Sequence, residues 1–276
     1  MTTELQEGAS MQLLDQLPQI ELSESGRAYV YGEDEYVRVT DVIHKVLPPY
    51  LAPWAEDVGH KAAIAIYERD GELPTSVAEL KQLVRDAGLT CEDEKQSGAD
   101  RGSSLHLAIE AMIRTGDVIS VSDFEDPEHA KYAQSFAQFM LDYKPVFEEA
   151  EIRVVHPELG YAGTFDAIGR VTAKPKGARG VDLTGKRIVF DFKTNKKKSV
   201  YEQHLYQLAA YELALTHWGV EVEGSAVVAL GPAGDIKGKP YTFRGNYVDR
   251  RAFEQVMKTY HLFDEMRKRN PLAKKR

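Results

Sequence analysis

The fold of this chain is decided by two short stretches, GYAGTFD at residues 160–166 and VFDFKT at residues 189–194. Both are largely apolar and carry aromatic or β-branched residues, which predicts strands over residues 161–171 and 187–193. Charged side chains are rare in buried strands, so the charges within these stretches need a reason.

The side-chain alternation of a strand indicates where those charges lie. Alternate residues point to the same face, so Asp191 and Lys193 are expected to project together. Phe190 and Phe192 then project into an apolar core on the opposite face. A hairpin between the two strands brings Asp166 beside them. Two carboxylates and an ammonium are therefore expected at one place on the sheet.

Two converging carboxylates form a hard oxygen site that suits Mg²⁺ or Mn²⁺. Such an ion accepts a phosphate oxygen as a further ligand, and a nearby ammonium stabilises a pentavalent phosphorus, as phosphodiester hydrolysis requires. The single cysteine, Cys91, excludes a cluster or zinc site built from several protein thiolates. Any metal here is expected on oxygen and nitrogen ligands.

Around these strands the sequence predicts an α/β chain with a small mixed sheet flanked by helices. Residues 1–26 are acidic and poorly patterned, and are expected to form a disordered arm. Residues 27–99 are expected to form a mostly helical N-terminal cap, residues 100–266 the core and residues 267–276 a basic tail. Within the core, a long helix is expected over residues 127–149.

Composition excludes several classes of protein. The 276 residues are enough to bury a hydrophobic core, and no apolar run approaches the roughly 20 residues that cross a bilayer. No membrane contact is expected, and the lack of a secretory signal predicts a cytoplasmic location. The net charge of −8 has the wrong sign for coating nucleic acid, so local clusters such as Lys196, Lys197 and Lys198 would have to grip a DNA backbone.

Candidate site residues also lie on the predicted helices. His106 and Glu110 share the margin of an apolar face in an amphipathic helix over residues 103–114. His106 is expected in the site, whereas Glu110 either supports it or is an ordinary exposed acid. Glu151, on the strand before Asp166, is a second-tier candidate.

A later helix, over residues 200–218, places Gln203, Gln207 and Tyr211 on one face. A glutamine on a largely apolar helix needs a hydrogen-bond partner. That partner is either the sheet or a group in the active site, and the two roles are compatible.

Together these motifs resemble the PD-(D/E)XK nuclease superfamily, specifically its RecB-like branch with many phage-type exonucleases. The motifs are His106 on an upstream helix, Gly163-x-x-Asp166, Asp191-x-Lys193 and Gln207-x-x-x-Tyr211. The resemblance is close over about residues 100–214 and looser over 38–62. The literal Pro-Asp is Phe165-Asp166 here, and the four cysteines that hold an iron-sulfur cluster in some relatives are missing, so no such cluster is expected.

The resemblance implies a restriction-endonuclease-like core with a helical N-terminal cap, and a DNA exonuclease dependent on Mg²⁺ or Mn²⁺. The residues that it assigns to the site are the metal ligands Asp166, Asp191, His106 and the Phe192 carbonyl, the catalytic Lys193, and the substrate-facing Gln207 and Tyr211. It implies DNA and recombination, repair or replication proteins as partners, in a bacterial or phage-infected cell, and leaves an oligomer open. The alternatives are a catalytically silent nucleic-acid-binding or scaffold protein, or a structure-specific endonuclease or RNase.

Overall fold

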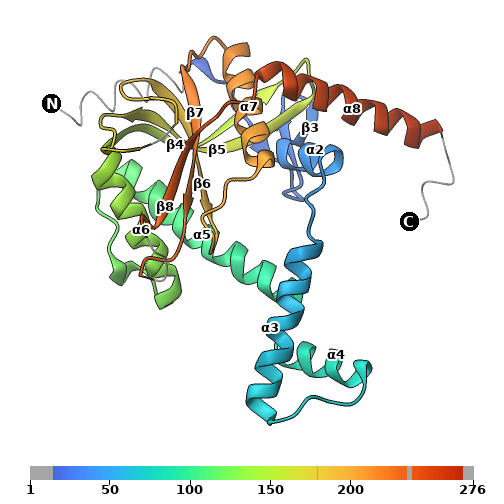
Figure 1. Ribbon diagram of the computed structural model, residues 1–276. Coiled ribbons are helices and arrows are strands. Elements are labelled where there is room, and N and C mark those ends of the chain that lie inside the picture. Colours follow the sequence, from blue (N-terminus) through green and yellow to red (C-terminus); the bar gives the residue numbers. More distant parts are fainter. Residues whose placement is uncertain (1–14, 179, 235–237, 270–276) are drawn as a thin grey trace. The chain divides into compact units, whose positions relative to one another are not determined.

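The computed structural model describes residues 15–178, 180–234 and 238–269 (Figure 1). It divides into two compact units, one formed by Met1–Pro48 with Leu105–Arg276 and the other by Pro49–Ser104. The second unit consists of α3 (Ala52–Asp70), α4 (Val77–Asp86) and the first part of α5 (Cys91–Thr115). The region expected as one cap, residues 27–99, is therefore shared between the two units.

The first unit is built on a mixed sheet, which in the described part of the chain has eight strands. They are β1 (Glu21–Leu22), β2 (Ala28–Tyr31), β3 (Asp34–Arg38), β4 (Pro145–His156), β5 (Tyr161–Val171), β6 (Arg187–Thr194), β7 (Gly224–Leu230) and β8 (Tyr241–Gly245). β5 is central: it pairs with β4 along one edge, and along the other with β3 near its start and β6 near its end. β6 and β7 run parallel, whereas β4, β5 and β6 form an antiparallel meander.

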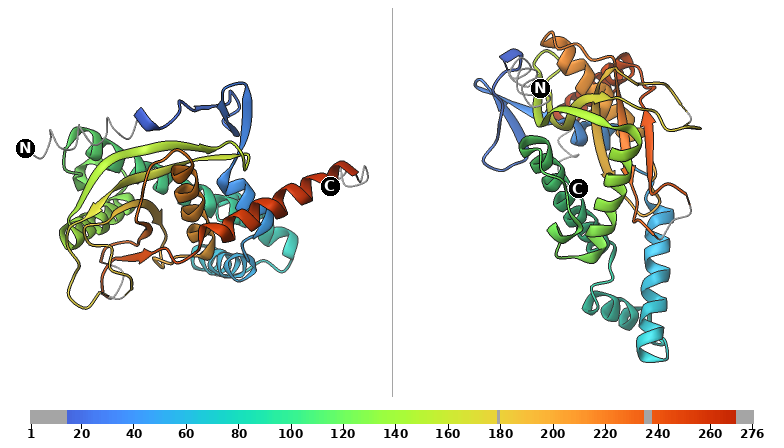
Figure 2. Two further views of the ribbon diagram at one scale, coloured as in Figure 1. Left: turned by 90° about the horizontal axis from the view of Figure 1, so that it is seen from above. Right: turned by 90° about the vertical axis from the view of Figure 1, so that its left-hand side faces the viewer.

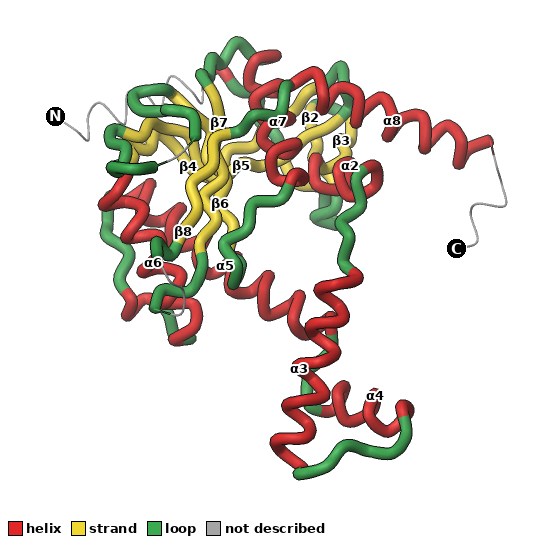
Figure 3. Tube along the Cα trace, viewed as in Figure 1, coloured by secondary structure: helices red, strands yellow, loops and turns green. Residues whose placement is uncertain are grey.

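Helices cover both faces of this sheet (Figures 1 and 2). One face packs against α2 (Val39–Val46), α7 (Glu202–His217) and α8 (Arg250–Arg269), and we call this the α7-side core. The other face packs against the end of α5 and against α6 (Pro127–Tyr143), and we call this the α6-side core. The short 3₁₀ helix η1 (Val121–Asp123) lies against α6. Figure 3 shows the strands in yellow between helices in red. The mixed α/β architecture is the predicted one.

The helix expected over residues 127–149 ends earlier, at Tyr143. Lys144 takes a left-handed conformation with φ 46°, which ends the helix, and its N–H bonds the Met140 carbonyl. Pro145 cannot continue a helix, because its ring clashes with the preceding turn and it has no N–H. Strand β4 therefore begins at Pro145, six residues before the predicted strand at Glu151.

The helix that carries His106 is longer than the predicted 103–114, and it starts at Cys91. Its start is stabilised by a reciprocal pair in which Asp93 N–H bonds the Thr90 hydroxyl and the Asp93 carboxylate accepts from Thr90 N–H. The expected core boundary at residue 100 therefore falls inside this helix.

Part of the expected N-terminal arm is ordered. Ile20 is buried, and its carbonyl accepts a hydrogen bond of 3.0 Å from Arg153. Strand β1 follows directly and pairs with β2. Residues 1–14 and 270–276 lie outside the described residues, and α8 extends to Arg269, into the region expected as a basic tail. Among the described helices, none has both the length and the hydrophobicity to cross a bilayer.

Candidate active site

Two paired strands, β4 and β5, change face at the same point. Phe165 packs in the α7-side core and Ala167 in the α6-side core, although they are two residues apart on one strand. Opposite the intervening Asp166 lies Glu151, whose φ of 52° is left-handed, while its neighbours on both sides pair with β5. Such a conformation costs a non-glycine residue about 1–3 kcal/mol, so the surrounding structure must hold it.

His106 faces both of these carboxylates from α5. Its Nδ1 lies 3.3 Å from Asp166 Oδ1 and 4.0 Å from Glu151 Oε1. Its Nε2 lies 3.0 Å from the Phe192 carbonyl, which can only accept, so Nε2–H is the donor. The three residues His106, Glu151 and Asp166 each offer a ligand atom, and these atoms lie within 4.8 Å of one another.

Strand β6 adds two charges to this cluster. The Phe192 N–H donates to Asp166 Oδ2 at 2.5 Å, which joins β6 to β5 at this point. Lys193 Nζ lies 2.7 Å from Asp191 Oδ1, and Asp191 Oδ2 is buried with no hydrogen-bond partner among the described residues. As predicted, Phe190 and Phe192 both lie in the α6-side core, with their rings stacked 6.2 Å apart.

The charged groups of this cluster shift one another's pKa values. Burial lowers the pKa of His106, but Asp166 and then Asp191 raise it to about 9. Burial and the charge of Asp166 raise the pKa of Glu151 to about 7. Burial also raises the pKa of Asp191, although Lys193 opposes this, whereas the charges of His106 and Lys193 outweigh burial and lower the pKa of Asp166.

Helix α7 covers the cluster with a glutamine and a tyrosine. Gln207 donates a hydrogen bond of 2.8 Å to the Tyr211 hydroxyl. The Tyr211 ring packs on Gly163, where an added Cβ would approach ring atom Cε1 to 2.7 Å, so glycine is needed there. Tyr211 is only 2% exposed. Gln207 remains partly exposed. The predicted role of both side chains toward a substrate stays a prediction.

Sequence reasoning did not find His204, which lies one turn before Gln207 on the same face of α7. Its Nδ1 accepts from the Tyr201 N–H at 3.4 Å, so a neutral imidazole carries its hydrogen on Nε2. Burial, followed by the charges of Lys193 and His44, lowers the pKa of His204 to about 3. The spacing His204, Gln207, Tyr211 was the available signal, since residues three and seven apart share a helix face.

The other predicted residues lie around the cluster. Glu110 binds Arg114 at 3.0 Å and lies outside the group of three candidate ligands. Lys196 and Lys197 are exposed in the loop after β6, whereas Lys198 is partly buried and donates to the Lys239 carbonyl. The Phe192 carbonyl contacts His106, so its role as a metal ligand stays a prediction.

These donors fit a hard divalent cation. One imidazole nitrogen and several carboxylate oxygens form the mixed set that Mn²⁺ or Mg²⁺ accepts. The buried Oδ2 of Asp191, which has no hydrogen-bond partner among the described residues, also supports a cation here. A buried anionic oxygen is costly unless something binds it. His106, Asp166 and Glu151 would hold such an ion, with Asp191 beside them.

The metal-free chain is expected to lose stability as pH rises. Folding raises the pKa of His106 from 6.5 to about 9, so its stabilising effect is complete below pH 6.5 and lost through about pH 9. Glu151 and Asp191, whose pKa values are also raised, change in the same direction at lower pH. Between pH 6.5 and 9 the loss should be about 2 kcal/mol, or roughly 4–8 °C in Tm.

Thermal unfolding of the metal-free chain at several pH values measures this loss. His106→Gln is the control, and its profile should be flatter between pH 6.5 and 9. An equally steep fall of Tm with pH in His106→Gln would show that His106 does not cause the loss of stability. Added Mn²⁺ should raise the Tm of the wild type more at pH 8 than at pH 6, because the ion competes with protons.

Comparisons with known proteins leave the family open. No protein-family model matches the chain, and no curated protein matches it. Among solved structures, the chain is similar to the crystal structure of SSO0001, with 13% identity and a TM-score of 0.35. That alignment covers 95% of this chain and 86% of the other. A similarity at this level decides neither fold family nor function.

Proposed function

We propose that this chain is a Mg²⁺- or Mn²⁺-dependent deoxyribonuclease. The observation that carries the proposal is the meeting of four groups from separate elements, His106 from α5, Glu151 from β4, Asp166 from β5 and Asp191 from β6, with Lys193 in contact with the last. An acidic cation site beside a fixed ammonium is the arrangement that phosphodiester hydrolysis needs.

The order of elements supports a restriction-endonuclease-like core. A helix precedes the antiparallel meander β4, β5 and β6, and α7 then leads to β7, which pairs parallel to β6. The candidate residues lie on the meander and on the helices beside it. The PD-(D/E)XK superfamily, in its RecB-like branch without an iron-sulfur cluster, is the family we propose.

A bound divalent cation would withdraw charge from the phosphate and make water more acidic. In the reaction, a water oxygen bonds to phosphorus, the bond from phosphorus to the 3′ oxygen breaks, and a proton passes from the water to the leaving oxygen. Burial lowers the pKa of Lys193, but Asp191 and Asp166 outweigh it and raise the pKa. Lys193 thus remains an ammonium. It would stabilise negative charge on the pentavalent phosphorus rather than accept a proton from water.

Neighbouring residues would hold the nucleic acid. Neutral His204, with hydrogen on Nε2, and the amide of Gln207 offer donors on the face of α7 that covers the site. Lys196 and Lys197 are exposed in the loop directly after β6, where they can contact phosphates on either side of the cleaved one. The exonuclease mode and a place in phage-type recombination, repair or replication come from the resemblance of the motifs.

The test is a time course on linear DNA labelled at the 5′ or the 3′ end, with Mg²⁺, Mn²⁺ or a chelator. Covalently closed circular DNA of the same sequence and a matching RNA are the parallel substrates. We expect degradation of the linear DNA with either metal, no reaction with chelator, and intact circles. The end from which label is lost first gives the polarity.

Other outcomes identify the alternatives. Cleavage of closed circles would indicate an endonuclease, and cleavage of RNA alone an RNase. DNA binding without hydrolysis in either metal would contradict the proposal and favour a nucleic-acid-binding or scaffold protein.

A further inference from the structure

We propose that Arg114 is a positioning residue for the metal site, which it serves by holding the backbone that aims Glu151. This inference rests on the proposed function, because it concerns the same cation site. Arg114 touches neither His106 nor Asp166 in any described contact, and its expected effect is transmitted through β4.

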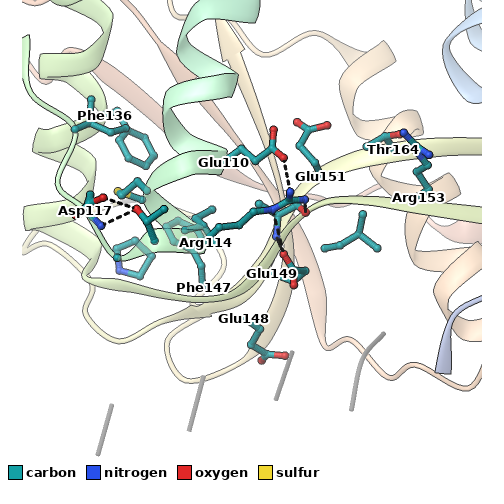
Figure 4. Close-up of a pocket in the computed structure, with 18 of the residues that line it drawn as sticks. Glu110, Arg114, Asp117, Phe136, Phe147, Glu148, Glu149, Glu151, Arg153 and Thr164 are labelled. Atoms are coloured by element: carbon teal, nitrogen blue, oxygen red, sulfur yellow. Dashed lines mark hydrogen bonds and ion pairs between the residues drawn. The ribbon is translucent and has the colours of Figure 1, made fainter. Parts of the chain in front are cut away.

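Arg114 makes three contacts, two of which connect the end of α5 to β4 (Figure 4). Its guanidinium lies 3.0 Å from Glu110 Oε1 on its own helix and 3.8 Å from Glu149 Oε1 on the strand. It also donates to the Ala150 carbonyl at 3.5 Å. Glu149 in turn accepts from the Ala150 N–H at 3.0 Å. Both polar groups of the Ala150 backbone are thus bound by this network.

Ala150 directly precedes the left-handed residue Glu151. A strand would relax by returning Glu151 to the extended region, which would turn its side chain away from Asp166 and toward the other face. Contacts that fix the preceding peptide oppose this relaxation. The side chains of Arg114 and Glu149 supply such contacts in addition to the backbone ladder that joins β4 to β5.

The same helix supplies a candidate ligand and the anchor. His106, Glu110 and Arg114 are spaced four residues apart, so they form one row along α5. His106 meets Asp166 and Glu151 at one end of the row, and Arg114 meets Glu149 and Ala150 at the other. The row therefore links the position of the His106 ring to the backbone of β4 next to the left-handed Glu151.

The carboxylates of the groove at this place argue against Arg114 as a general phosphate contact. The groove, of about 1580 Å³, runs along β4 and is lined by Glu110, Glu148, Glu149 and Glu151 as well as Arg114. These carboxylates would repel a phosphate group that entered the groove. Arg114 is engaged by two of them, which suits a structural link rather than a phosphate contact.

The test uses Mn²⁺ affinity, because the two readings of Arg114 predict changes of opposite sign. If Arg114 acted only as a charge, Arg114→Met would remove a cation near the site and tighten Mn²⁺ binding. If it positions Glu151, the same change weakens binding by roughly tenfold or more, the usual effect of removing a residue that orients a ligand. Isothermal titration calorimetry measures the affinity, and chemical unfolding reports whether the variant is folded.

Two further variants separate positioning from a general loss of structure. In a Glu151→Gln background, Arg114→Met should have little additional effect on Mn²⁺ affinity, since the group through which it acts is already lost. Arg114→Lys, which keeps the charge but not the forked donors, should fall between wild type and Arg114→Met. Arg153→Met removes an arginine from the same groove, and its Mn²⁺ affinity should be unchanged or slightly higher.

Unchanged or tighter Mn²⁺ binding by a folded Arg114→Met would overturn the inference and leave the proposed function intact. Equal weakening in the wild-type and Glu151→Gln backgrounds would also overturn it, because Arg114 would then act independently of Glu151. A wild-type protein that binds no Mn²⁺ would overturn the proposed function, and this inference with it.

Discussion

Asp191→Asn is expected to slow hydrolysis severely and to weaken Mn²⁺ binding strongly. The side chain is 1% exposed, and its Oδ2 has no partner within the described chain, so a cation is the natural partner of this oxygen. Asparagine has almost the same shape but lacks the charge. The loss should be about 4 kcal/mol in the barrier, roughly a thousandfold in rate. End-labelled linear DNA measures the rate, and calorimetry the affinity.

Asp182→Asn is the matched control for Asp191→Asn. It makes the same chemical change at a carboxylate that is 61% exposed and pairs weakly with Lys174 at 3.9 Å. We expect wild-type rates and affinities for it. A far-ultraviolet circular dichroism spectrum like that of the wild type would show that Asp191→Asn is folded. Near wild-type activity in folded Asp191→Asn would overturn the assignment of the site.

Lys193→Met is expected to separate metal binding from catalysis. The Lys193 ammonium lies 2.7 Å from Asp191 Oδ1 and stays protonated because neighbouring carboxylates raise its pKa. Without it, negative charge on the phosphorane loses one fixed donor, which should lower the rate by roughly a hundredfold to a thousandfold. Mn²⁺ affinity should be equal or higher, because a cation next to the metal has been removed.

Asp191→Asn and Lys193→Met are expected to differ in their effect on Mn²⁺ affinity. Asp191→Asn should lose both affinity and rate, whereas Lys193→Met should lose only rate. Lys196→Met serves as control for Lys193→Met, since it removes an exposed lysine three residues away in the following loop. Its expected effect is a modest loss of DNA affinity. Near wild-type hydrolysis by Lys193→Met would exclude the catalytic role of this lysine.

Much of the sheet was predictable from local patterns. The predicted strands 161–171 and 187–193 match β5 and β6 to within one residue. These elements have strong periodicity over their whole length, and nothing in their neighbourhood interrupts it. The beginning of β4 was missed because its aromatic and acidic residues continue the pattern of α6 beyond the break at Lys144 and Pro145.

The candidate site was predicted in part. Asp166, Asp191, Lys193 and His106 could be named from their positions in motifs, and the structure brings them together. Glu151 ranked lower in the sequence, because a strand position gives no sign of a left-handed backbone. His204 was not named, although its spacing from Gln207 and Tyr211 on one helix face was a local signal. Arg114 was not named because its partners on β4 lie far away in the sequence.

The sequence by itself determined that Asp191 and Lys193 share one face of a strand while Phe190 and Phe192 occupy the other. The reason is local, since the alternation of a strand depends only on its backbone and on which face is buried. Only the tertiary structure decided that β4 and β5 bend together at Glu151 and Asp166, and that His106 meets them there. A left-handed glutamate is held by contacts from another helix, and no local pattern encodes contacts of that kind.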